Sequence, residues 1–197
     1  MNLPNKLSIF RVLLVPLIVF VYLFPFANYG ITLFSITIDE IVLSGVQLIV
    51  LALFVIASIT DFLDGYIARK YKMITSFGKF IDPIADKLLV NTVFLLLAVS
   101  GTIEVVPVLI MIWRDTMVDA MRMMAAQKGV VVAARIWGKL KTVLQMVTIV
   151  IVLLNDLPFA LFQLEVGKWL VWISAIISMY SGIVYFKQCK QYIMESK

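Results

Sequence analysis

Four aspartates lie close together in the stretch DFLDGYIARKYKMITSFGKFIDPIAD, which runs from Asp61 to Asp86. Asp61 and Asp64 are three residues apart, and Asp82 and Asp86 are four apart. On α-helices both spacings place the paired side chains on one face. Carboxylates gathered in a low dielectric repel one another, and a divalent cation relieves that repulsion. Because oxygen ligands suit Mg²⁺, Ca²⁺ or Mn²⁺ rather than zinc, we interpret all four aspartates as metal ligands.

Uncharged runs at 41–60 and 88–103 flank this stretch, which predicts two helices joined by a tight turn at 72–75. Carboxylates at the end of a membrane span are costly and usually functional. Gly65 and Ala68 lie beside the first carboxylate pair, where small side chains leave room for a ligand to reach the metal. The alternative for these two residues is close helix packing.

Phosphates are the common partners of metals held by carboxylates. A metal site at the membrane surface suits a substrate with a lipid tail and a pyrophosphate head. Arg69 could contact that head group, or it could serve only as a snorkelling anchor. The chain contains no histidine, so histidine ligands and a histidine base are excluded.

The composition predicts an integral membrane protein. Hydrophobic residues make up 62% of the chain and charged residues 15%, whereas a soluble domain is about half apolar. The single cysteine, Cys189, excludes an internal disulfide. Since no long polar stretch interrupts the apolar runs, we expect one all-α membrane domain over residues 1–197.

Hydropathy predicts a bundle of six transmembrane helices, preceded by a short N-terminal interfacial segment at Pro4. Six spans place both termini on one side, and the basic residues of the connections assign that side to the cytoplasm by the positive-inside rule. The expected spans cover residues 7–24, 41–71, 76–99, 105–126, 133–155 and 165–186.

Four basic residues could bind a phosphate on a second substrate. Arg114 and Arg122 belong to the fourth span, and Lys139 and Lys141 to the fifth. Both residue types bind phosphate, arginine with a fork geometry. Lys139 and Lys141 could instead anchor their span, and Asp115 could simply pair with Arg114. Only the short apolar run 105–113 precedes Arg114, and a charge at that depth indicates a polar cavity.

The central stretch resembles the signature of the CDP-alcohol phosphatidyltransferase family, D-x2-D-G-x2-A-R-x8-G-x3-D-x3-D. The resemblance implies a dimeric enzyme with six transmembrane helices, in which an alcohol displaces CMP from a CDP-linked lipid. It implies Mg²⁺ or Mn²⁺ as cofactor, with two ions expected. Asp61, Asp64 and Asp82 would be metal ligands, and Asp86 a further ligand or the general base. The residues that would surround the CDP moiety are Asn5, Asp61, Gly65, Ala68, Arg69 and Gly78.

The chemistry of the residues agrees with this resemblance, because a carboxylate can take the proton of the attacking alcohol. With no histidine present, Asp86 is the candidate base. Four further segments resemble the branch of the family that makes phosphatidylglycerophosphate: NLPNKLSIFRV, DPIADKLLV, WRDTMVDAMR and WGKLKT. They predict transfer of the phosphatidyl group from CDP-diacylglycerol to sn-glycerol 3-phosphate.

Several alternatives to this reaction stay open. Serine or inositol phosphate could be the acceptor, although serine, a zwitterion, needs fewer cations. A cation transporter would more often show repeats and interrupted helices, and an assembly protein gives no reason to bury four carboxylates. We expect membrane lipid and a second copy of the chain as partners, no nucleic acid, and a bacterial cell membrane as the location.

Overall fold

The computed structural model describes residues 2–39, 41–71, 75–127 and 136–194, without the side chains of residues 69, 76, 79 and 191–194. Its described part is almost entirely helical, which confirms the all-α prediction. The α-helices are α1 (Leu3–Leu23), α2 (Gly45–Lys70), α3 (Ser76–Val99), α4 (Val105–Gln127), α5 (Ile136–Leu153) and α6 (Val166–Met194).

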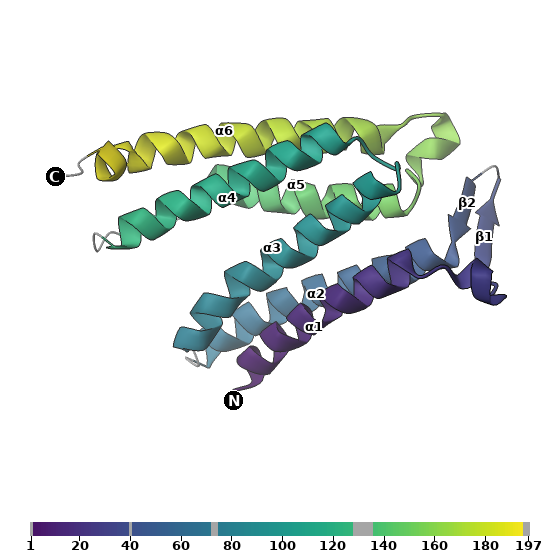
Figure 1. Ribbon diagram of the computed structural model, residues 1–197, viewed down its shortest axis with the longest axis horizontal. Coiled ribbons are helices and arrows are strands. Elements are labelled where there is room, and N and C mark those ends of the chain that lie inside the picture. Colours follow the sequence, from purple (N-terminus) through teal and green to yellow (C-terminus); the bar gives the residue numbers. More distant parts are fainter. Residues whose placement is uncertain (1, 40, 72–74, 128–135, 195–197) are drawn as a thin grey trace.

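The helices form two groups of three (Figure 1). In the first group α1 packs against α2 and α3, and in the second α6 packs against α4 and α5. Contacts of α3 with α4 and of α2 with α5 join the groups, and Phe54, Phe94, Leu97 and Ile149 are among the buried core residues. Helix α1 begins and α6 ends at the same end of the bundle, as expected for an even number of antiparallel helices (Figure 1).

Four helices in the described part are long and apolar enough to cross a membrane, namely α1, α2, α5 and α6. Helices α3 and α4 have similar lengths but carry charged residues along half of their course. Large apolar side chains lie exposed on the bundle, including Leu13, Phe20, Trp113, Trp169 and Ile176. An outer surface of this kind suits lipid rather than water, so the protein is a membrane protein; six spans remain a prediction.

The second helix begins at Gly45 and not at residue 41, so the predicted start of that span was wrong. Residues 41–44 instead form strand β2 (Ile41–Ser44), which pairs antiparallel with β1 (Ser35–Ile38). A short apolar run fits a strand as well as a helix. Gly45 permits the abrupt change, because a Cβ there would lie 2.6 Å from the Phe34 carbonyl oxygen.

Other boundaries match the sequence prediction more closely. The predicted third span, 76–99, coincides with α3. The interfacial segment predicted at Pro4 is not separate from the first span, because Pro4 stands in the first turn of α1, one continuous helix. Helix α6 continues beyond residue 186 to Met194. Most of the predicted turn at 72–75, and the first residues of the predicted span 133–155, lie outside the described residues. Two 3₁₀ turns, η1 (Phe26–Tyr29) and η2 (Phe159–Phe162), lie in the connections before β1 and α6.

Candidate active site

Arg11 of α1 joins the first pair of aspartates. Its side chain is fully buried, and its Nη1 and Nη2 atoms form ion pairs with Asp61 and Asp64 of α2. The Asp64 side chain is 4% exposed and that of Asp61 is 37% exposed. Arg11 therefore supplies positive charge to carboxylates that would otherwise repel each other in a dry environment.

Ser8, one helical turn before Arg11, extends this cluster to the second pair of aspartates. Its hydroxyl lies 2.5 Å from Asp82 Oδ1 on α3 and 3.5 Å from Asp64 Oδ2 on α2. The same Oγ also lies 3.0 Å from the Pro4 carbonyl oxygen. The structure thus brings Asp61, Asp64 and Asp82 to one face of α1.

The aspartates converge on side chains of α1 rather than on one another. Among the described residues, no group of three or more acidic side chains is close enough to hold a metal ion directly. The donor set nevertheless consists of carboxylate oxygens with one serine hydroxyl, which is the chemistry that Mg²⁺ and Mn²⁺ prefer. The partial exposure of Asp61 leaves one carboxylate accessible from outside the bundle.

Asn5 and Gly78, both expected near the CDP moiety, lie together beside Asp82. Thr75 Oγ1 donates to Asn5 Oδ1 (2.8 Å) and accepts a hydrogen bond from Gly78 N (3.0 Å). A Cβ at Gly78 would lie 3.3 Å from Asn5 Oδ1 and 3.7 Å from Asp82 Oδ2. The absence of a side chain at Gly78 therefore keeps the backbone close to both polar groups.

Gly65 and Ala68 lie on α2, half-buried, in the turns that follow Asp61 and Asp64. The side chain of Arg69 lies outside the described residues, so its predicted contact with the nucleotide stays a prediction.

Replacing Thr75 by alanine is expected to destabilise the start of α3 by about 1 kcal/mol, because the substitution removes an N-cap. It also releases Asn5 from its hydrogen bond. Thermal unfolding in detergent measures the loss, and Thr75→Ser, which keeps the hydroxyl, serves as the control. A Thr75→Ala protein as stable as wild type would show that the cap contributes nothing.

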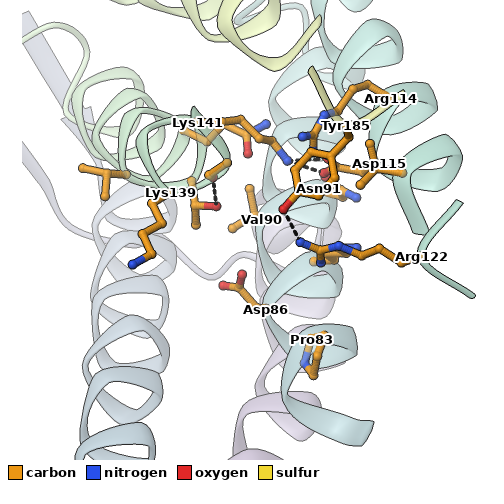
Figure 2. A pocket seen from close by; sticks show the side chains of 16 residues that line it. Pro83, Asp86, Val90, Asn91, Arg114, Asp115, Arg122, Lys139, Lys141 and Tyr185 are labelled. Carbon is orange, nitrogen blue, oxygen red and sulfur yellow. Dashed lines mark hydrogen bonds and ion pairs between the residues drawn. The ribbon is translucent and has the colours of Figure 1, made fainter. Parts of the chain in front are cut away.

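Asp86, one helical turn after Asp82, lines a cavity that Asp82 does not line. This cavity of about 410 Å³ lies between α3, α4, α5 and α6. All four basic residues predicted to bind a phosphate, Arg114, Arg122, Lys139 and Lys141, line the same cavity. In Figure 2, Asp86 lies between Lys139 on one side and Arg122 on the other. The structure therefore places the candidate base among the candidate phosphate-binding residues.

Asp115 neutralises part of the positive charge in this cavity. The buried carboxylate accepts hydrogen bonds from Arg114 Nη1 (2.8 Å) and Lys141 Nζ (2.5 Å), which confirms the suggested pairing of Arg114 with Asp115. Arg122 and Lys139 form no ion pair with the acidic groups of the described residues. The cavity consequently keeps an excess of positive charge that suits an anionic ligand.

The sequence analysis missed several residues of the site, among them Ser8 and Arg11 of α1. Arg11 lies inside an apolar span, where a charge requires a buried partner, and this could have identified it. Ser181 and Tyr185 of α6 contact Arg114 and Arg122. The sequence could have indicated these two residues, because the spacing of Ser178, Ser181 and Tyr185 places polar groups on one face of an otherwise apolar helix.

Comparisons with known proteins agree with this arrangement. The sequence profile of the CDP-alcohol phosphatidyltransferase family matches residues 1–180. The chain is 38% identical to CDP-diacylglycerol–glycerol-3-phosphate 3-phosphatidyltransferase of Rickettsia typhi, over 97% of this chain and 98% of that protein. It is 36% identical to the protein of the same name from Bacillus subtilis, over 95% of this chain and 94% of that one. The chain belongs to the CDP-alcohol phosphatidyltransferase family.

Proposed function

We propose that this protein transfers the phosphatidyl group of CDP-diacylglycerol to sn-glycerol 3-phosphate, giving phosphatidylglycerophosphate and CMP. The observation that carries the proposal is the shared cavity of Asp86 and the four basic residues. Glycerol 3-phosphate has two parts that match it, a phosphate for the cations and a hydroxyl for the carboxylate. The names of the relatives from Rickettsia typhi and Bacillus subtilis support the same reaction.

The acceptor phosphate binds among the basic residues of the cavity, of which Arg122 and Lys139 lack acidic partners among the described residues. This places the acceptor hydroxyl toward Asp86, which takes its proton as the oxygen attacks. The new bond joins that oxygen to the phosphorus of the phosphatidyl group. The bond from this phosphorus to the bridging oxygen of CMP breaks, and CMP leaves with the electron pair.

Asp61, Asp64 and Asp82 would hold the two Mg²⁺ or Mn²⁺ ions that the family resemblance implies, with Asp86 as the base or a further ligand. Asn5, Asp61, Gly65, Ala68, Arg69 and Gly78 would surround the CDP moiety. When bound, such ions offset the negative charge that develops on the departing CMP. Arg11 balances the charge of Asp61 and Asp64, and Ser8 links Asp82 to the same cluster. Resemblance to the family supports a homodimer, and the basic residues of the connections support a cytoplasmic active site with both termini on that side.

Release of CMP by the purified protein tests the reaction. With CDP-diacylglycerol and Mg²⁺, we expect release on addition of glycerol 3-phosphate, little release with serine, and loss of activity with EDTA. Serine lacks the phosphate that the excess positive charge of the cavity favours.

Inositol phosphate carries a phosphate as well, so the same assay must decide between it and glycerol 3-phosphate. Release with inositol phosphate alone would change the acceptor and keep the aspartate chemistry. Activity that persists in EDTA would contradict the metal site. No release with any acceptor, from folded protein, would favour the transporter or assembly alternatives.

A further inference from the structure

Helix α6 supplies one wall of the cavity and holds an arginine of α4 there. The Tyr185 hydroxyl accepts a hydrogen bond from Arg122 Nη2 at 2.5 Å, and the Tyr185 ring centroid lies 4.9 Å from Arg122 Cζ. Tyr185 itself is 2% exposed. Figure 2 shows this pair at the edge of the cavity, above Asp86. A buried tyrosine with this double contact fixes the direction of the guanidinium group.

Arg114, two helical turns before Arg122, rests on the same face of α6. Its Nη2 donates to Ser181 Oγ at 2.7 Å, and its Cζ lies 5.7 Å from the Tyr185 ring centroid. A Cβ at Gly182 would lie only 2.9 Å from Arg114 Cγ. Gly182 therefore lets the stem of Arg114 lie directly against the helix, where a larger residue would displace it.

The two arginines retain donors that no described residue uses. Arg114 Nε and Arg122 Nε are both buried and have no hydrogen-bond partner among the described residues. Buried polar groups are normally satisfied, and a guanidinium presents its donors in a fork that matches phosphate oxygens. Two cations that share one aromatic ring also repel each other, and a bound anion relieves that repulsion.

We infer that the face of α6 formed by Ser181, Gly182 and Tyr185 positions Arg114 and Arg122 for the phosphate of the acceptor. These three are positioning residues, because they act through the arginines. The inference rests on the proposed function for the identity of the acceptor. It assigns to the last helix a part in selecting phosphorylated over unphosphorylated alcohols.

Tyr185→Phe tests the inference, because it removes the hydroxyl and keeps the ring. The KM for glycerol 3-phosphate should rise by roughly five- to tenfold, since the lost hydrogen bond orients a charged group. The kcat and the KM for CDP-diacylglycerol should change by less than about twofold. The substitution weakens only the binding of glycerol 3-phosphate, and it does so equally in the ground state and the transition state. Gly182→Ala, which displaces Arg114, should raise the same KM.

Tyr180→Phe is the matched control. Tyr180 lies on the same helix, is exposed, and packs edge-on against Trp137. Tyr180→Phe should leave kcat and the KM values for both substrates unchanged. An unchanged KM for glycerol 3-phosphate in both Tyr185→Phe and Gly182→Ala would overturn the inference. An equal rise in Tyr180→Phe would also overturn it, since a general loosening of α6 would then explain the effect.

A binding measurement separates this inference from the proposed reaction. Glycerol 3-phosphate and inorganic phosphate should each raise the melting temperature of the wild-type protein, because a ligand of the folded state stabilises it. Both shifts should shrink in Tyr185→Phe and persist in Tyr180→Phe. Undiminished shifts in Tyr185→Phe would contradict the inference even if the transferase reaction is found. If the melting-temperature shifts are smaller in Tyr185→Phe but no transferase reaction is found, only the proposed reaction is rejected and the positioning role of α6 stands.

Discussion

Asp86→Asn is expected to lower kcat by about 10²- to 10⁴-fold, the range that a positioned general base contributes. The change keeps the size of the side chain and removes its ability to accept the proton of the acceptor. The basic residues around the cavity stay in place, so the KM for glycerol 3-phosphate should change little. CMP release at saturating concentrations of both substrates measures the effect.

Asp39→Asn is a suitable control, because it removes the same charge from an exposed position in the hairpin, at the opposite end of the bundle. Full activity in Asp86→Asn would remove Asp86 from catalysis. A higher Mg²⁺ requirement with an unchanged kcat at saturating Mg²⁺ would identify Asp86 as a metal ligand and not as the base.

Arg11→Met is expected to lower the free energy of unfolding by about 3–5 kcal/mol, the usual result when one partner of a buried ion pair is removed. Methionine fills similar space but leaves Asp64 buried without its cation. Asp61 contributes less to this loss, because solvent screens its partly exposed carboxylate. Chemical unfolding in detergent measures the change.

The double variant Arg11→Met with Asp64→Asn should be more stable than Arg11→Met alone, because the unpaired buried charge is gone. Coupling between contacting residues is about 0.5–3 kcal/mol in such cycles. If the two substitutions instead act additively, the stability effect of Arg11 does not come from its pairing with Asp64. Arg11→Lys keeps the charge but cannot reach two carboxylates with a fork, so its stability should be intermediate.

The helices could be predicted because long apolar runs have few alternatives in a membrane protein. The uncharged run 88–103 located the apolar part of α3, although the helix begins at Ser76, twelve residues before this run. The hairpin before α2 could not be predicted in the same way, because its apolar strand continues directly into an apolar helix. The close contact of Gly45 with the Phe34 backbone, which ends the strand, appears only in three dimensions.

The candidate site, too, could be predicted only where it depends on local helix geometry. The spacing of Asp61 and Asp64 reflects local helix geometry and was sufficient to predict that they share a face, because both contact Arg11. The same argument did not separate Asp82, which contacts Ser8, from Asp86, which lines the cavity. The partners of these residues come from distant segments. Arg11 meets Asp64 across 53 positions in the sequence, and Arg122 meets Tyr185 across 63. No periodicity within one helix specifies such pairings.

Helix α3 carries Asp82 toward α1 and, one turn later, Asp86 toward the cavity walled by α4, α5 and α6. Four residues of helix span about 6 Å, so in the proposed reaction α3 would act as a fixed spacer between nucleotide binding in one helix group and acceptor binding in the other. The two kinds of recognition would then be modular. Substitutions confined to the second group, α4 to α6, would exchange one alcohol for another, while the first group would still bind the same CDP-linked lipid.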